Sequence, residues 1–149
     1  MMTTNENFSH RYFEKARNAA LLSDYGKFHI GCIAVYCNQI IGIGCNSNKT
    51  HPKQRYYNKY RNMASDNCEP IPKIHAEMMC LNAISKLDID FSKVHLYVYR
   101  PLKMTPYGMA RPCQACMNAI KDLGIKNVYY TSNNGYVHEI IENFNNERN

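Results

Sequence analysis

The sequence has no apolar run close to the roughly 20 residues that a membrane-spanning helix needs. Its first residues also lack the basic stretch and apolar stretch that form a secretory signal. It contains no internal repeat and no low-complexity segment. Because no secretory signal is visible, we expect the chain to lie in the reducing cytoplasm. With 149 residues, 45% of them hydrophobic, it is expected to form a single domain over residues 1–149.

Acidic residues are scarce relative to basic ones, and the formal net charge is +6. Such a balance favours phosphate-bearing partners, either nucleotides or nucleic acid. The excess is concentrated in residues 49–61, which contain no acidic side chain and interleave cations with tyrosines. We expect residues 47–72 to form a long, exposed loop that contacts phosphate and stacks on bases, or a solvated loop whose tyrosines pack against the body. The residues concerned are Lys49, Lys53, Arg55, Lys59 and Arg61, with Tyr56, Tyr57 and Tyr60.

The seven cysteines do not indicate a disulfide framework, because their number is odd and the expected compartment is reducing. Two of them, Cys113 and Cys116, follow Pro112 three residues apart. The other five stand alone, and we expect each to behave as a small buried apolar residue. These are Cys32, Cys37, Cys45, Cys68 and Cys80.

Apolar spacing and turn residues predict alternating helices and strands. A hairpin with its turn at Asn38 and Gln39 joins the first two strands. Only 18 residues follow Thr131, and an Asn-Gly turn comes directly before the last expected strand. This leaves no room for the dozen or more connecting residues of a parallel crossover, so the last two strands should form an antiparallel hairpin. The expected helices are 5–23, 74–87 and 113–123, and the expected strands are 30–36, 40–45, 94–99, 126–131 and 136–141.

This order predicts a layered α/β fold with a mixed sheet of about five strands, helices on both faces and an antiparallel C-terminal hairpin.

Two short motifs carry the chemistry: His-Ala-Glu at residues 75–77 and Pro-Cys-x-x-Cys at residues 112–116. A catalytic zinc ion takes three protein ligands and leaves its fourth position to water. Cysteines three apart in the first turn of a helix face the same way, where the helix dipole favours thiolates. Each motif alone is also typical of an ordinary helix start, a redox pair or a structural zinc site. Together, at two expected helix starts, they predict one zinc site formed by His75, Cys113 and Cys116, with Glu77 as general acid and base.

The two motifs resemble the signature of the cytidine and deoxycytidylate deaminase superfamily, zinc enzymes that remove exocyclic amines from nucleobases. The resemblance implies a cytidine deaminase-like fold, bound Zn²⁺ and a proton-shuttling role for Glu77. It also implies that Asn46 holds the sugar or base of the substrate and that the backbone N–H of Ala76 contacts the base.

The branch of the superfamily remains open. A histidine as first ligand resembles the deoxycytidylate, tRNA adenosine and guanine deaminases, whereas the short antiparallel tail resembles the free cytidine deaminases. Arg111 and the extended loop at residues 101–110 depart from the deoxycytidylate pattern. Arg111 is either a phosphate contact or a surface charge. The candidate phosphate or nucleic-acid contacts are Lys49, Lys53, Arg55 and Arg111.

The function expected first is deamination of cytidine, deoxycytidine or deoxycytidylate to the uracil product and ammonia. The alternatives are a deaminase acting on single-stranded DNA or RNA through the basic loop, and a non-catalytic zinc or nucleic-acid-binding module. The last would need a fourth ligand from Cys68, Cys80 or His51. A second metal site at His51 and Cys68, and a homo-oligomer, also remain open.

Overall fold

The computed structural model describes residues 2–4, 10–61, 72–105 and 107–142, and for residues 2–4 only the backbone. Its helices and strands follow the predicted order, with additions at the N-terminus, after the first hairpin and just before the third predicted strand. They are β1 (Met2–Thr4), α1 (His10–Ala20), β2 (Gly31–Tyr36), β3 (Gln39–Cys45), α2 (Pro52–Tyr57), η1 (Asn58–Tyr60), α3 (Ala76–Ile84), η2 (Phe91–Lys93), β4 (His95–Tyr99), α4 (Gln114–Leu123), β5 (Asn127–Ser132) and β6 (Gly135–Ile140).

The strands form one sheet in the order β1-β6-β5-β4-β2-β3. Only β4 and β5 pair in parallel, and β5 and β6 form the predicted antiparallel hairpin. The mixed α/β sheet is therefore confirmed, and it has one strand more than the roughly five expected. The added strand, β1, spans three residues and lies antiparallel to β6 at the sheet edge. Three residues are too few for an alternating pattern to be recognised.

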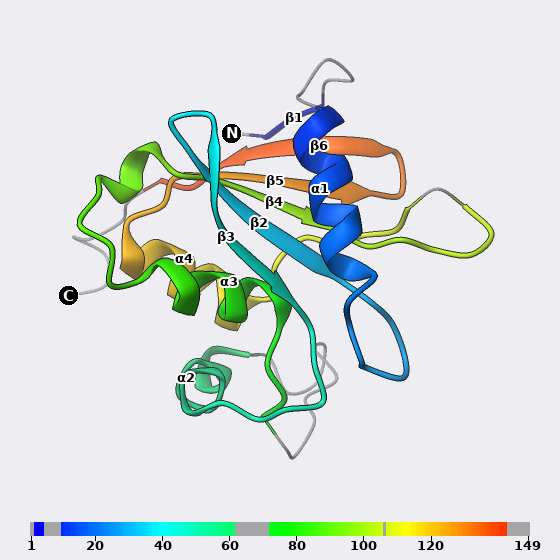
Figure 1. Ribbon diagram of the computed structural model, residues 1–149, viewed down its shortest axis with the longest axis horizontal. Coiled ribbons are helices and arrows are strands. Elements are labelled where there is room, and N and C mark those ends of the chain that lie inside the picture. Colours follow the sequence, from blue (N-terminus) through cyan, green and yellow to red (C-terminus); the bar gives the residue numbers. More distant parts are fainter. Residues whose placement is uncertain (1, 5–9, 62–71, 106, 143–149) are drawn as a thin grey trace.

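Helices cover both faces of the sheet, as predicted (Figure 1). On one face α1 buries Phe13 and Ala16 against Ile33 and Tyr97. On the other face α3 and α4 pack on strand residues of the opposite parity, such as Cys32. The described part of α1 is shorter than the predicted helix, because it ends at residue 20 and residues 5–9 lie outside the described ranges.

The turn between β2 and β3 lies one residue earlier than predicted. Cys37 and Asn38 both have positive φ, 51° and 61°, as a two-residue type I′ turn requires. Gln39 already pairs with Tyr36 as the first residue of β3. Cys37 is exposed in this turn, so its predicted burial is wrong. Cys32 and Cys80 are buried as expected, Cys45 is partly buried, and Cys68 lies outside the described residues.

The basic segment is not the structureless loop that was predicted, because residues 52–60 form α2 and η1. His51 caps α2 by accepting a hydrogen bond from the backbone N–H of Lys53, and Pro52 suits the first helical position. Gln54 is fully buried. A helix this short carries too few residues for a periodic apolar pattern, so it depends on tertiary contacts. Residues 62–71 lie outside the described ranges.

Within the described residues, no helix is both long and apolar enough to cross a membrane.

Candidate metal centre

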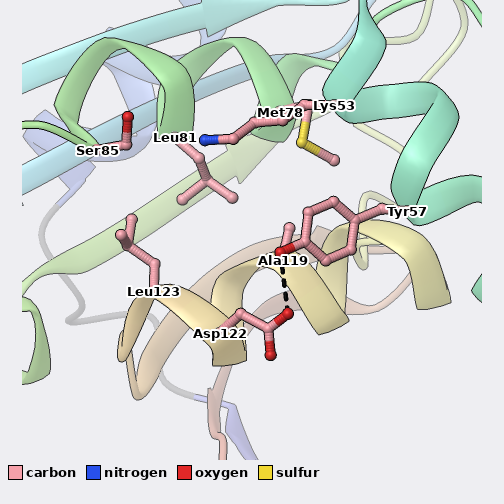
Figure 2. Close-up of a pocket in the computed structure, with 8 residues that line it drawn as sticks. All are labelled: Lys53, Tyr57, Met78, Leu81, Ser85, Ala119, Asp122 and Leu123. Carbon is pink, nitrogen blue, oxygen red and sulfur yellow. Dashed lines mark hydrogen bonds between the residues drawn. The ribbon is translucent and has the colours of Figure 1, made fainter.

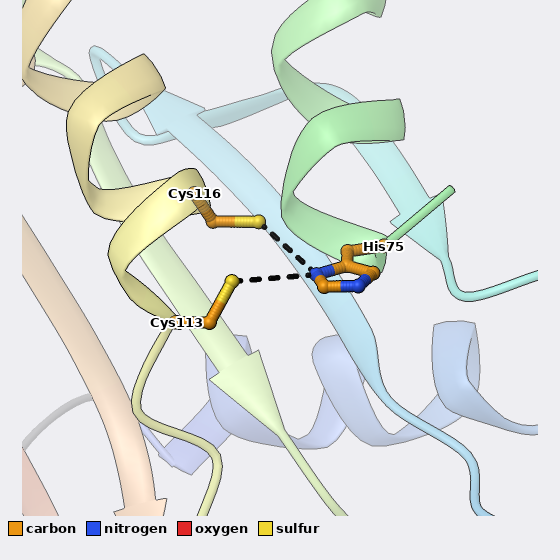
Figure 3. A group of neighbouring side chains, drawn as sticks. All are labelled: His75, Cys113 and Cys116. Atoms are coloured by element: carbon orange, nitrogen blue, oxygen red, sulfur yellow. Dashed lines mark hydrogen bonds between the residues drawn. The ribbon is translucent and has the colours of Figure 1, made fainter. Parts of the chain in front are cut away.

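Two helix starts bring the motif residues together. His75 is the N-cap of α3 and Cys113 is the N-cap of α4, both with extended backbone and neither using its side chain to cap the helix. Cys116 follows in the first turn of α4 and is fully buried. Because neither N-cap side chain makes a capping hydrogen bond to its own helix, the side chains of His75 and Cys113 can point toward each other between the starts of α3 and α4 (Figure 3).

The three side chains have the spacing that one zinc ion requires. His75 Nδ1 lies 3.6 Å from Cys113 Sγ and 3.4 Å from Cys116 Sγ. Zinc bonds of about 2.3 Å to sulfur and 2.0–2.1 Å to nitrogen, at tetrahedral angles, would separate nitrogen and sulfur by about 3.6 Å. All candidate ligand atoms of the group lie within 4.8 Å of one another. The residues therefore fit a zinc ion that keeps one coordination position open.

The electrostatics of the site favour metal binding. The hydrogen bond with Cys116, followed by the bond and charge of His75, lowers the pKa of Cys113 to about 4. The same hydrogen bond between the two thiol groups, followed by burial, raises the pKa of Cys116. The lowered pKa favours the thiolate of Cys113, the form that binds metals. Zinc would favour deprotonation of the second thiol in the same way.

Glu77 lies in the first turn of α3 and is only 4% exposed. Burial raises its pKa to about 7, although the nearby charge of His75 acts to lower it. The charges of both His75 and Cys113 act on this pKa, so the carboxyl lies within electrostatic reach of the metal group. A carboxyl with a pKa near neutrality can both accept and release a proton, as a general acid and base must.

Asn46 holds neighbouring backbone in place. Its Oδ1 accepts a hydrogen bond from the N–H of Ile30, and its Nδ2 donates to the carbonyl of Phe28, both at 2.9 Å. The residue is 5% exposed, and its two side-chain hydrogen bonds hold the backbone of residues 28–30, which lead into β2. Ala76 is buried at the first position of α3, next to His75.

The structure does not bring the basic candidates into the group of His75, Cys113 and Cys116. Lys49 and Arg55 are exposed. Lys53 lines a pocket of about 130 Å³ between α2, α3 and α4 (Figure 2). Arg111 forms two hydrogen bonds with the carboxylate of Glu139, both 2.9 Å long, so its guanidinium is committed to an ion pair.

The proposed fourth ligands and second metal site find no support among the described residues. There, His75, Cys113 and Cys116 form the only group of three or more histidine, cysteine or acidic side chains that could hold a metal ion. His51 instead accepts from the N–H of Lys53 and lies 2.7 Å from the side-chain amide of Asn82. Cys68 lies outside the described residues.

Two residues near the site were not singled out by their sequence pattern. Gln54 accepts a 2.9 Å hydrogen bond from the backbone N–H of His75. Arg61 lies within electrostatic reach of His75. Burial and the charge of Arg61 act to lower the pKa of His75, but the hydrogen bond and charge of Cys113 and the charge of Glu77 outweigh them and raise it. A buried glutamine inside a basic stretch gives no periodic signal, whereas Arg61 was visible only as one cation among several.

Comparison with known proteins agrees with this geometry. Residues 2–132 match the family described as cytidine and deoxycytidylate deaminase zinc-binding region. No curated protein sequence matches the chain. The fold resembles that of the dCMP deaminase from the cyanophage S-TIM5, which was solved in complex with dCMP and dUMP. The two chains share 18% sequence identity and superpose with a TM-score of 0.58 over 87% of this chain and 85% of that one. The fold also resembles the cytidine deaminase from Burkholderia pseudomallei, with 19% identity, a TM-score of 0.59, and coverage of 88% and 91%.

The family match spans most of the chain, and the described residues hold a His/Cys/Cys group of zinc-binding geometry at two helix starts. The chain belongs to the cytidine and deoxycytidylate deaminase family of zinc-binding proteins.

Proposed function

We propose that the protein is a zinc-dependent hydrolase that converts a cytosine nucleoside or nucleotide to its uracil product and ammonia. The observation that carries this proposal is the 3.4–3.6 Å spacing of His75 Nδ1 from the two sulfurs, beside the buried carboxyl of Glu77. Family membership and the two structural relatives support deamination of cytosine compounds in general.

In this proposal His75, Cys113 and Cys116 hold the zinc ion. When bound, zinc lowers the pKa of a water molecule toward about 7 and so supplies a nucleophile at neutral pH. Glu77 accepts the proton that this water loses. It delivers this proton to the ring nitrogen. It then takes the remaining proton of the attacking water, now a hydroxyl on the ring carbon, and passes it to the departing amine, which leaves as ammonia. The net reaction exchanges the exocyclic amine for the oxygen of water.

Five further residues are proposed to contact or attract the substrate. Asn46 positions the backbone around Phe28 and Ile30. One N–H and one lone pair of its side chain have no partner among the described residues, and these are proposed to contact the sugar or base. The backbone N–H of Ala76 is proposed to contact the base. Lys49, Lys53 and Arg55 are proposed to attract a phosphate-bearing substrate through their positive potential.

A second candidate is a deaminase of single-stranded nucleic acid. Its supporting observation is an exposed aromatic and basic surface on α2 and η1, where Lys59 Nζ lies 3.8 Å from the ring centre of Tyr56. Tyr56 is 55% exposed and presents a face on which a base could stack. A non-catalytic zinc module is less well supported, because structural zinc normally has four protein ligands and the described residues supply three.

A substrate panel separates these candidates. The zinc-loaded protein is incubated with cytidine, deoxycytidine, deoxycytidylate, guanine, single-stranded DNA and RNA. Ammonia release and the mass of each product are then measured. We expect conversion of at least one cytosine monomer. Conversion of an oligonucleotide with no turnover of any monomer would favour the second candidate, and inactivity on the whole panel would contradict both enzymatic proposals.

A further inference from the structure

The basic segment around α2 turns three polar side chains toward the helices that carry the metal ligands. His51, Gln54 and Tyr57 are spaced three residues apart and so share one helical face. His51 lies 2.7 Å from Asn82 of α3. Tyr57 donates a 2.9 Å hydrogen bond to Asp122 of α4 (Figure 2). The segment is thus docked onto both α3 and α4.

Gln54 is the member of this set that reaches the metal group. Its side chain is fully buried, and its Oε1 accepts a 2.9 Å hydrogen bond from the backbone N–H of His75. Its Nε2 donates a 2.8 Å hydrogen bond to Oδ1 of Asn58, the C-cap residue that follows α2. Because both ends of the amide are engaged, its orientation is fixed.

We propose that Gln54 is a positioning residue that holds His75 in place for metal binding. The N–H at a helix N-cap has no partner inside its own helix. For His75 that partner is Gln54, and the bond fixes the backbone of the residue whose ring must keep Nδ1 at 3.4–3.6 Å from both sulfurs. The basic segment would therefore support the metal centre through the buried side chain of Gln54, in addition to presenting an exposed basic surface. The inference rests on the proposed role of His75 as a zinc ligand.

Simple docking of α2 would predict a different pattern of mutational effects. In that case any lost contact between the segment and the helices should weaken metal binding to a similar degree. Tyr57→Phe provides the matched comparison, because it removes the bond to Asp122 of α4 while keeping the aromatic ring and leaving Gln54 in contact with His75.

The test measures zinc affinity in the full chain by competition with a chromogenic chelator, and records the absorption spectrum after cobalt replaces zinc. Gln54→Met keeps the length of the side chain but removes its acceptor and donor. We expect it to weaken zinc binding about tenfold or more, as is typical when a group that orients a metal ligand is lost, and to shift the cobalt spectrum. Gln54→Glu keeps an oxygen facing the His75 N–H and should recover most of that loss. Tyr57→Phe should bind zinc like the parent.

Zinc affinity of folded Gln54→Met equal to that of the parent would overturn the inference, as would an equal loss in Tyr57→Phe. If Gln54→Met does not fold, Asn58→Ala takes its place, because it removes the acceptor that orients the Gln54 amide. That variant should show a smaller but measurable loss of zinc affinity, and parent-like binding would count against the inference.

Failure of the proposed function would look different. A parent protein that binds no zinc, or a His75→Ala variant that binds it as tightly as the parent, would remove the proposed metal centre itself. A parent that binds zinc and deaminates, alongside an unaffected Gln54→Met, would remove only the role of Gln54.

Discussion

Arg111 Nε and Nη2 each lie 2.9 Å from a different carboxylate oxygen of Glu139. This ion pair joins the residue before Pro112 to β6. Tyr130 donates a further 3.0 Å hydrogen bond to the same carboxylate. Burial acts to raise the pKa of Glu139, but the hydrogen bond and charge of Arg111 outweigh it, so the pKa lies below its ordinary value of 4.5. The segment leading to Cys113 is therefore held by a pH-dependent contact.

Glu139→Gln should make stability less sensitive to acid. A depressed pKa in the folded state contributes stability that is complete above 4.5, the value expected for the unfolded chain, and that is lost as the pH falls through the folded value. The variant lacks this contribution, so it should be less stable than the parent at neutral pH and approach it in acid. Urea unfolding at a series of pH values measures the effect. Glu142→Gln, at an exposed carboxyl nearby, is the control, and its stability should depend on pH as that of the parent does. An identical acid dependence in Glu139→Gln and the parent would contradict the stabilising role of the Arg111–Glu139 ion pair.

Loss of one sulfur should abolish stoichiometric zinc. Cys113→Ser replaces a thiolate, whose pKa is lowered to about 4 in the parent, by a hydroxyl that does not ionise at neutral pH. We expect the purified variant to contain little zinc, and we expect removal of zinc from the parent by a chelator to abolish turnover and lower the melting temperature. Elemental analysis and thermal unfolding provide the readouts.

Cys37→Ser is the matched control for this prediction, because Cys37 is an exposed cysteine in the turn between β2 and β3. It should retain one zinc ion per chain. Full zinc content in Cys113→Ser would show that the metal is held elsewhere.

Close packing of β3 on α3 supports the position of His75. A methyl group at Gly44 would overlap the carbonyl oxygen of Ala76 and lie 2.6 Å from the backbone nitrogen of Cys80. Both obstacles are helix backbone, so Gly44→Ala must push the start of α3 away from the sheet. We expect a loss of about 1–3 kcal/mol in unfolding free energy and weaker zinc binding.

Chemical denaturation and zinc titration measure these two effects. Gly26→Ala is the matched control, since an added methyl there would meet nothing within 4 Å. Unchanged stability and zinc affinity in Gly44→Ala would show that α3 has room to move.

The metal group could be predicted from sequence because its parts are local. His75 and Glu77 share one helical turn, as do Cys113 and Cys116, and a helix start fixes the direction of each pair. The long strands and helices were predicted for a similar reason, since each contains enough residues for a period to be recognised. The strand β1 and the helix α2 contain too few.

Contacts between distant parts of the chain could not be predicted in this way. Arg111 gives the same local pattern whether it meets phosphate or, as observed, the carboxylate of Glu139, 28 residues away. Gln54 appears as one polar residue among cations, and its burial depends on α2 docking against the start of α3. The chemistry of the site is thus encoded locally, and the structure that holds it in place is encoded by tertiary packing.

We propose that Glu77 moves protons at a zinc centre held by His75, Cys113 and Cys116. Deamination of the best cytosine substrate should be compared in the parent and Glu77→Gln, with zinc content measured on the same samples. We expect Glu77→Gln to keep its fold and one zinc ion per chain while turnover falls by about 10²–10⁴-fold, the usual contribution of a general acid–base group. Turnover equal to that of the parent, with zinc retained, would contradict the account.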